Sequence, residues 1–238
     1  MGGSKNMSEK YGIIGAMDHE VAALAKQLEN RTSETIAGME FFSGSFGDTP
    51  AVVVKCGMGK VNAGICAHTL INRYGVTAVI NTGAAGSLDN RIEIGDMVVS
   101  TDAVQHDFDV SPIGFQKGEI PYTGLYAFAA DEDLRKRAEK AIAEAVPEVH
   151  VFPGRIASGD QFIASHEQKE TIVREFGALC CEMEGAAIAQ VCYLNRTPFV
   201  IIRAISDKAD GSAEMSFDQF AEAAAKHGVA AVHRMLKQ

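Results

Sequence analysis

The stretch PFVIIRAIS, residues 198–206, is the most apolar strand pattern in the chain. Its apolar residues follow one another without the alternation of a half-exposed strand, which predicts a strand buried on both faces. Other short apolar runs predict strands at residues 11–17, 51–55, 76–83, 96–101, 155–160 and 178–183. Because helical patterns lie between most of these runs, we predict an α/β protein with a mostly parallel sheet covered by helices on both faces.

The predicted helices follow the strands along the chain. They comprise the stretch from Val21 to Leu28, the stretch from Gly59 to about Tyr74, and residues 131–146, 166–176 and 184–194. A last helix is expected to begin at Ser216, because Ser216 and Gln219 have the spacing of a capping box. No linker divides the pattern, so residues 11–238 are expected to form one domain. The polar residues 1–10 lack the apolar core of a signal peptide and are interpreted as a disordered tail or an expression scar.

Composition narrows the possible functions. The net charge is −9 over 238 residues, which argues against nucleic acid as a partner because phosphate binding requires clustered Lys and Arg. No apolar run reaches the roughly 18 residues that cross a bilayer, so no membrane partner is expected. Five cysteines without a C-x-x-C pair and seven scattered histidines predict reduced thiols, no metal site and no cofactor. We therefore expect a cytoplasmic protein that acts on small neutral or cationic molecules.

Acidic side chains follow three of the predicted strands. Glu20 follows the first strand, Glu184 follows the strand ALCCEM, and Asp207 follows PFVIIRAIS. Ligands of parallel α/β sheets bind at the carboxyl ends of the strands, so these three carboxylates are expected to converge. Carboxylates in one cleft can have their pKa values driven apart, which gives an acid and a base.

Each of these carboxylates also has a purely structural interpretation. A carboxylate such as Glu20 is common at a helix N-terminus, where the helix dipole stabilises it. Arg203, inside the apolar strand, is a natural partner for a buried Asp207. One of Glu182 and Glu184 is explained as a helix cap, although two carboxylates in an apolar passage both need partners. The residues alone leave both interpretations open.

Two glycine-rich loops lie at predicted strand ends. NTGAAGS, residues 81–87, is a small-residue segment in which the backbone either approaches a ligand closely or makes a tight turn. GMGK, residues 57–60, lacks the G-x-x-x-x-G-K-[ST] frame of a phosphate-binding loop. The strand ends therefore present carboxylates and small residues rather than a recognisable nucleophilic arrangement of Ser or Cys with His.

Five segments, taken in order, carry a family resemblance: GIIGAM-x-x-E, NTG-x-AG, SGD-x-F, EMEG-x-AIA and RAISD. Over residues 11 to about 236 they resemble the 5′-methylthioadenosine/S-adenosylhomocysteine nucleosidase family of the nucleoside phosphorylase superfamily. The resemblance implies a three-layer α/β fold with a central mixed, barrel-like sheet flanked by helices, and a homodimer. It also implies hydrolysis of the N-glycosidic bond of 5′-methylthioadenosine, S-adenosylhomocysteine and 5′-deoxyadenosine, which releases adenine for methionine salvage and methyl-cycle recycling.

The same resemblance implies separate roles for the carboxylates. Asp207 would protonate or hydrogen-bond the adenine ring, Glu20 would activate water, and Glu184 with Met183 would hold the ribose hydroxyls. The other residues that it places around the substrate and the water are Met17, Ala84, Ala85, Gly86, Phe162, Ile163, Arg203 and Ser206. An acid at the purine and a base on water suit this chemistry, because breaking the bond puts negative charge on the purine and positive charge on the sugar.

A further segment is expected to act on the neighbouring subunit. In this family an apolar stretch of one subunit holds the 5′-alkylthio group in the other. The matching residues here are Val110, Ile113, Phe115 and Pro121. Ile113 stands where an aromatic residue is frequent, and Ala84 stands where some relatives have serine. The departure at Ile113 leaves the preferred 5′-substituent open, and the departure at Ala84 removes one possible hydroxyl contact.

The nearest alternative is a purine or uridine phosphorylase of the same superfamily. Such enzymes bind phosphate with arginines, whereas the first loop here carries Asp18, His19 and Glu20, and Thr82 precedes Gly83. Water is therefore the predicted nucleophile. Two further alternatives stay open: a hydrolase of 6-amino-6-deoxyfutalosine that uses the same mechanism, and a nucleoside-binding protein without catalytic activity.

Overall fold

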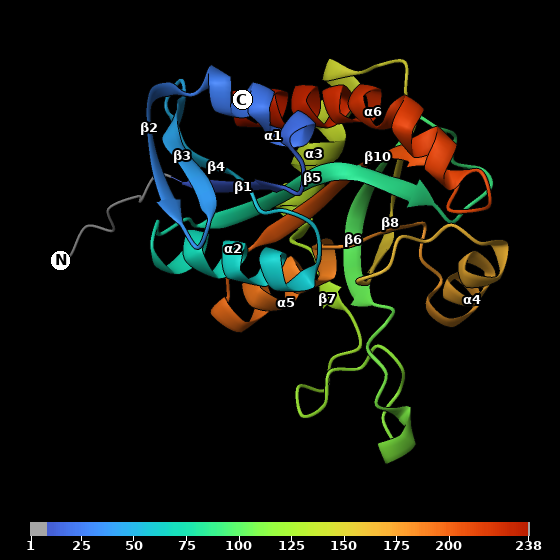
Figure 1. The fold of residues 1–238 in the computed structure, drawn as a ribbon. Coiled ribbons are helices and arrows are strands. Elements are labelled where there is room, and N and C mark those ends of the chain that lie inside the picture. Colours follow the sequence, from blue (N-terminus) through green and yellow to red (C-terminus); the bar gives the residue numbers. More distant parts are fainter. Residues whose placement is uncertain (1–8, 238) are drawn as a thin grey trace.

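The computed structural model of the protein describes residues 9–237, except for the side chains of residues 214, 215 and 218. Ten strands in this part of the chain form one mixed sheet, and helices cover it on both sides (Figure 1). The expected tail, residues 1–10, falls largely outside the described residues. At its end, Lys10 exchanges hydrogen bonds with Thr77 next to the sheet.

The centre of the sheet is a closed ring of five strands. In this ring β5 (Ala78–Ser87) pairs with both β10 (Phe199–Asp207) and β9 (Cys180–Glu182). The strands β6 (Met97–Gln105) and β8 (Val151–Ser158) complete it, because β10 pairs with β6, β6 with β8, and β8 with β9. Two of the pairs, β5 with β9 and β10 with β6, are antiparallel. The ring confirms the predicted three-layer fold with a mixed, barrel-like sheet flanked by helices.

A second set of strands extends from β5 through β1 (Tyr11–Gly15). β1 pairs in parallel with β5 and with β4 (Thr49–Lys55). β4 then pairs antiparallel with β3 (Met39–Phe46), which forms a hairpin with β2 (Glu29–Ile36). The hairpin escapes prediction because β2 is polar and almost wholly exposed, and it pairs with β3 at the sheet edge without an apolar periodic pattern. The short β7 (Phe128–Ala129), which pairs with β6, has no sequence signal either.

Helices form the two outer layers of the fold (Figure 1). One layer consists of α1 (Asp18–Gln27), α3 (Glu132–Ala145) and α6 (Ala213–Leu236). The other layer consists of α2 (Lys60–Asn72) and α5 (Gly185–Asn195), and α4 (His166–Phe176) packs beside the end of the barrel. None of the described helices is long and apolar enough to cross a membrane.

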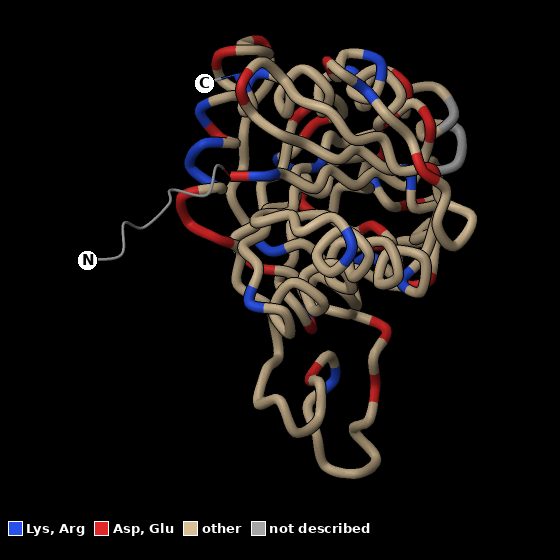
Figure 2. Tube along the Cα trace, turned by 90° about the vertical axis from the view of Figure 1, so that its left-hand side faces the viewer, with Lys and Arg blue, Asp and Glu red and all other residues tan. Residues whose placement is uncertain are grey.

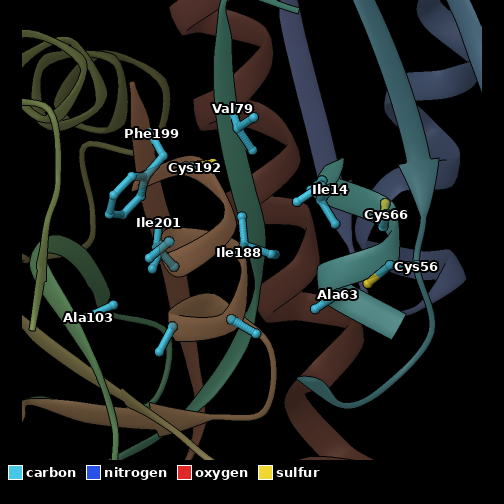
Figure 3. Close-up of a cluster of buried hydrophobic side chains, with 14 of the residues drawn as sticks. Ile14, Cys56, Ala63, Cys66, Val79, Ala103, Ile188, Cys192, Phe199 and Ile201 are labelled. Atoms are coloured by element: carbon cyan, nitrogen blue, oxygen red, sulfur yellow. The ribbon is translucent and has the colours of Figure 1, made fainter. Parts of the chain in front are cut away.

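Successive side chains of the central strands pack into opposite layers. Ile14 and Val79 lie in the core beneath α2 and α5 (Figure 3). Their neighbours Ile13 and Ile80 lie in the second core, beneath α1, α3 and α6. Because helices cover both faces of the sheet, neither face of these strands needs polar residues. The strands therefore appear in the sequence as continuous apolar runs.

The predicted helix bounds are confirmed for α4 and wrong for the start of α6. The side chain of Ser165 accepts the Gln168 amide at the start of α4, and Gly177, with a φ of 62°, ends it. In contrast, Ser216 already lies inside α6, because its amide donates to the Ser212 carbonyl at 3.0 Å. The helix therefore begins at Ala213, one helical turn earlier than the spacing of Ser216 and Gln219 predicts.

The stability of the protein should be sensitive to truncation of a buried side chain in β5, because β5 has three neighbouring strands. We expect Ile80→Ala to lower the free energy of unfolding by about 2–5 kcal/mol, the usual cost of a cavity in a packed core. As a control, Thr35→Ala on the exposed face of β2 should change it by less than about 0.5 kcal/mol. Urea unfolding of both variants measures these changes, and equal effects would contradict this description of the core.

Candidate active site

A cavity that is partly open to solvent lies at the carboxyl ends of β1, β5 and β10, and its empty space, open solvent included, is about 570 Å³. The structure brings Glu20, Glu184 and Asp207 together in this cavity. The other predicted residues that line it are Met17, Ala84, Ala85, Gly86, Phe162, Ile163, Met183 and Ser206. Arg203 lies directly behind the lining, where its guanidinium contacts the carboxylates of Glu182 and Glu184.

Glu20 is held by backbone amides at one side of the cavity. Its Oε2 accepts hydrogen bonds from the amides of Ala16 at 2.6 Å and Met17 at 2.9 Å, and its Oε1 accepts one from Ala84 at 3.0 Å. The first two bonds belong to the start of α1, so the structural interpretation of Glu20 as a helix-end carboxylate is correct. The third bond ties the same carboxylate to β5, so Glu20 lies at the helix end and also lines the cavity.

Asp207 lies at the end of β10 and is almost wholly buried. Its Oδ1 accepts the Ala209 amide at 2.8 Å, and its Oδ2 accepts the Ser206 hydroxyl at 2.9 Å. Burial raises the pKa of Asp207, and these two hydrogen bonds offset only part of the rise. Asp207 therefore retains a proton to a higher pH than an ordinary aspartate, which suits a group that donates to a ligand.

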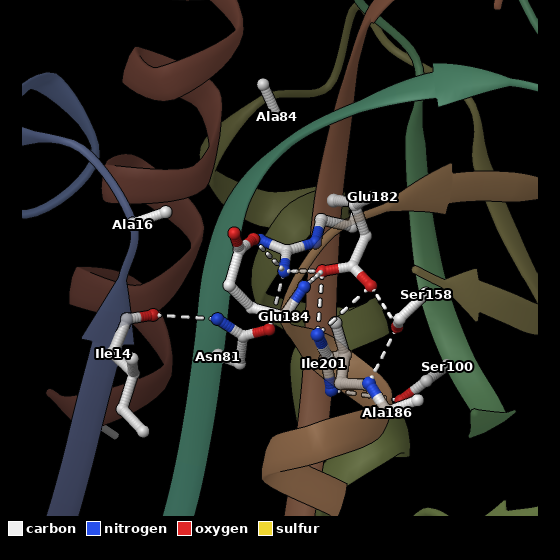
Figure 4. A network of polar contacts seen from close by, with 12 residues as sticks. Ile14, Ala16, Asn81, Ala84, Ser100, Ser158, Glu182, Glu184, Ala186 and Ile201 are labelled. Carbon is white, nitrogen blue, oxygen red and sulfur yellow. Dashed lines mark hydrogen bonds and ion pairs between the residues drawn. The ribbon is translucent and has the colours of Figure 1, made fainter. Parts of the chain in front are cut away.

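Arg203 pairs with Glu182, so the structural interpretation in which Arg203 is the partner of Asp207 is wrong. The guanidinium is 1% exposed, and its Nη2 donates to Glu182 and to Asn81 Oδ1 at 2.6 Å. Glu182 also accepts the Ser158 hydroxyl and, at 2.8 Å, the Gly185 amide at the start of α5 (Figure 4). Glu182 is thus both the helix cap and the partner of the buried arginine.

Glu184 is left free to face the cavity because Glu182 takes up these structural contacts. Its Oε1 accepts the Gly59 amide at 2.8 Å, and its Oε2 lies 3.9 Å from Nη2 of Arg203. Burial and the neighbouring Glu182 raise the pKa of Glu184 to about 7, against the opposing influence of Arg203 and the Gly59 amide. Glu182 and Glu184, which are separated by Met183, therefore make different contacts, and the sequence pattern does not distinguish them.

Two glycines of β5 make room for the carboxylates. A Cβ atom at Gly83 would collide with the carboxylate of Glu20 and the guanidinium of Arg203. A Cβ atom at Gly86 would lie 2.6 Å from Oδ1 of Asp207. The small residues of NTGAAGS are therefore required by the close approach of side chains from neighbouring elements, in addition to any ligand.

Several residues of the site have no sequence signal that identifies them. Met58, Gln161 and Phe217 also line the cavity. The ring of Phe217, on α6, meets the predicted Phe162 edge to face, with centroids 5.7 Å apart. Met58 is the second residue of the GMGK segment and Gln161 is the variable position of SGD-x-F, so membership of these segments is the one signal that points to them.

The four residues expected to act on a neighbouring subunit do not line this cavity. They lie between residues 106 and 127, in a segment that projects from the body of the molecule (Figures 1 and 2). Ile113 is 70% exposed at its 3-10 turn, and the ring of Phe115 packs against Tyr122 within the segment. Val110 and Pro121 are half-buried in the same segment.

Comparison with known proteins agrees with this geometry. Residues 10–237 match the model of the phosphorylase superfamily. Relatives from Bacillus pumilus and Bacillus subtilis, both named 5′-methylthioadenosine/S-adenosylhomocysteine nucleosidase, are 44% and 43% identical over 96% of this chain and 99% of their own length. The chain belongs to this nucleosidase family. The resemblance inferred from the five sequence segments is thereby confirmed.

Solved structures of the family have the same fold. The nucleosidase of Colwellia psychrerythraea in complex with adenine superposes with a TM-score of 0.92, at 38% identity over 97% of this chain and 95% of that one. A futalosine hydrolase of Helicobacter pylori superposes with a TM-score of 0.91, at 34% identity over 97% of this chain and 98% of that one. The nucleosidase fold thus also serves a related hydrolase.

Removing the buried guanidinium should destabilise the protein strongly. Arg203→Met leaves Glu182 and Glu184 buried without a cation, which typically costs about 3–5 kcal/mol of stability. The double variant Arg203→Met/Glu182→Gln should recover part of this loss, because it also removes the charge that has lost its partner. Chemical unfolding of the three proteins measures the effect, and a double variant less stable than the single one would contradict it.

The raised pKa of Glu184 should make its contribution to stability depend on pH. Between the ordinary value of 4.5 and the folded value of about 7, the folded protein binds a proton that the unfolded chain has released. The stability contribution of Glu184 is therefore greatest below this window and is lost as the pH rises through it. Glu184→Gln should gain stability relative to the native protein from about pH 5 to 7 and then level off. Unfolding measured across this range would refute the assignment if the difference stayed constant.

Proposed function

We propose that this chain hydrolyses the N-glycosidic bond of 5′-methylthioadenosine and S-adenosylhomocysteine and releases adenine. The observation that carries the proposal is the convergence of three buried carboxylates with different environments in one cavity. The names of its relatives and the adenine complex of a solved relative support the same substrate class. The reaction requires an acid for the purine, a base for water and a negative environment for the sugar, and the cavity supplies each.

Asp207 acts on the leaving group. In its protonated form it donates to the adenine ring as the bond between the purine nitrogen and the sugar carbon breaks, so that the electron pair of that bond is accepted by a less basic leaving group. The Ser206 hydroxyl and the Ala209 amide fix the orientation of its carboxyl group. The raised pKa of Asp207 keeps the donating form available nearer to neutral pH.

Glu20 acts on the water. The three backbone amides that donate to Glu20 fix the orientation of its carboxylate. Because a carboxylate has about four acceptor positions, one remains for a water molecule. The water oxygen bonds to the sugar carbon and its proton passes to Glu20. The products are adenine and the free 5′-substituted ribose.

Glu184 and Met183 hold the ribose. The Glu184 carboxylate accepts the sugar hydroxyls and, with Glu20, places negative charge near the sugar carbon that becomes positive in the transition state. Phe162 and the backbone of Ile163 frame the adenine ring, while Met17 and residues 84–86 line the sugar and water side of the cavity. Arg203 stays behind the carboxylates and stabilises their burial.

Water as the nucleophile is favoured over phosphate by the charges of the cavity. Nη2 of Arg203 donates to Glu182 and Asn81, and the guanidinium is buried behind the carboxylates. The group at the proposed water position is the carboxylate of Glu20. A phosphate ion would meet repulsion from Glu20 and Glu184 rather than a cluster of arginines. The structural similarity to a futalosine hydrolase favours 6-amino-6-deoxyfutalosine as a second candidate substrate of the same reaction.

We also propose that the protein is a cytoplasmic homodimer. Large apolar side chains are exposed on one face, where Val61 and Ile65 of α2 are 74% and 43% exposed and Leu194 of α5 is 63% exposed. Apolar residues gathered on one face are typical of an interface between proteins. In such a dimer, Val110, Ile113, Phe115 and Pro121 of one subunit would take their expected place at the cavity of the other subunit. The five cysteines are all free thiols, which fits a reducing compartment.

Neutralising either catalytic carboxylate should nearly abolish the activity. Glu20→Gln and Asp207→Asn are each expected to lower kcat by about 10²–10⁴-fold, the usual contribution of a general acid or base. Thermal unfolding should show that both variants stay folded. The matched controls Glu40→Gln and Asp48→Asn, exposed on β3 and its turn, should retain full activity.

The assay that tests the function is adenine release from 5′-methylthioadenosine, S-adenosylhomocysteine and 6-amino-6-deoxyfutalosine, each with and without phosphate. We expect release from the first two without phosphate. A requirement for phosphate would show that the protein is a phosphorylase and not a hydrolase. Release of adenine from 6-amino-6-deoxyfutalosine alone would make that compound the substrate in place of the other two.

A further inference from the structure

The hydrogen bond from the Gly59 amide to Glu184 depends on how the GMGK loop is held. This loop leads from β4 into α2, and Gly59 adopts a φ of 95°, a backbone conformation that glycine allows. Among the described residues, the Gly59 amide is the one hydrogen-bond donor to the carboxylate of Glu184, at 2.8 Å. The orientation of Glu184 is therefore tied to the position of this loop.

Three polar side chains hold the loop from its far side. The amide of Lys60 donates to Oδ1 of Asp160 at 2.8 Å, and the amide of Asp160 donates to Oδ2 of Asp107 at 2.8 Å. The ring closes where Nζ of Lys60 donates to Oδ1 of Asp107 at 2.6 Å. We call Lys60, Asp107 and Asp160 the clasp. Its members follow the carboxyl ends of β4, β6 and β8, so it joins three loops at one end of the barrel.

The clasp differs from an ordinary surface ion pair. The side chains of Lys60 and Asp107 are only 18% and 16% exposed, and Lys60 also donates to the buried side chain of Gln105 at 3.2 Å. Lys60 and the Asp160 amide hold the pKa of Asp107 below its usual value, although burial opposes this. A pair that is mostly withdrawn from water resists displacement more than exposed pairs do.

We propose that Lys60 and Asp107 are positioning residues for Glu184: through the clasp they fix the Gly59 amide that orients the carboxylate which holds the ribose. The proposal rests on the proposed function, because it takes Glu184 to bind the ribose hydroxyls. When the clasp opens, the GMGK loop loses its anchor, and Glu184 keeps only the more distant Arg203 as a partner. Recognition of the ribose weakens more than recognition of adenine, because Asp207, which acts on adenine, lies at the end of β10 and outside the clasp.

The test compares nucleosides with and without ribose hydroxyls. Lys60→Met and Asp107→Asn are made in a Glu20→Gln background, in which turnover is expected to be blocked, and binding is measured by calorimetry. Affinity for 5′-methylthioadenosine should fall about tenfold, the size expected for weakening one hydrogen bond to a charged group. Affinity for the same nucleoside without its 2′- and 3′-hydroxyls should change less than about twofold on that scale. Lys60→Arg, which keeps a cation in place, should restore much of the loss.

The control is Lys136→Met, which removes another lysine ion pair, with Glu132 on α3, outside the clasp and outside residues 106–127. It should leave both affinities unchanged. A second arm combines Lys60→Met with Glu184→Gln, and the double variant should bind no more weakly than Glu184→Gln alone. Equal losses for the two nucleosides, additive losses in the double variant, or no loss at all would overturn the positioning role. A native protein that binds the nucleosides without releasing adenine would overturn the proposed function and leave the binding test of the clasp valid.

Discussion

The buried guanidinium of Arg203 is the interaction on which the rest of the site depends. Burying several carboxylates together is costly unless a cation lies among them, and Arg203 is the cation that touches both Glu182 and Glu184. The closed barrel makes this contact possible because it sets β10 beside β5. At the level of Arg203, β5 contributes Gly83, whose missing side chain leaves the space that the guanidinium and Glu20 occupy.

Around this centre the carboxylates separate into supporting and reacting groups. Glu182 spends its hydrogen-bonding capacity on Arg203, Ser158 and the start of α5. Glu184 is thereby released to the cavity with a single amide donor. Asp207 lies away from the guanidinium, so burial rather than a nearby cation determines its proton affinity. A difference of contacts, and not of residue type, gives these acidic groups different chemistry.

The fold was predictable where buried strands leave continuous apolar runs, as in β1, β5 and β10. The β2–β3 hairpin was not, because backbone pairing holds an exposed polar strand without any periodic signal. Placement of Glu20, Glu184 and Asp207 at strand ends brought the site within reach of sequence reasoning. The partner of Arg203 was beyond it, because the choice between Glu182 and Asp207 is made by strand register and helix position in three dimensions.

The hairpin has a practical consequence for work with this protein. Its turn at residues 37–38, and the turn at residues 47–48 that joins β3 to β4, are exposed, and nothing lies near the position that a side chain at Gly38 or Gly47 would occupy. None of the hairpin residues lines the cavity, and β4 and β1 separate the hairpin from the barrel strand β5. These turns are therefore suitable places to insert an affinity tag, a fluorophore or a tether to a solid support, with the catalytic end of the barrel left accessible.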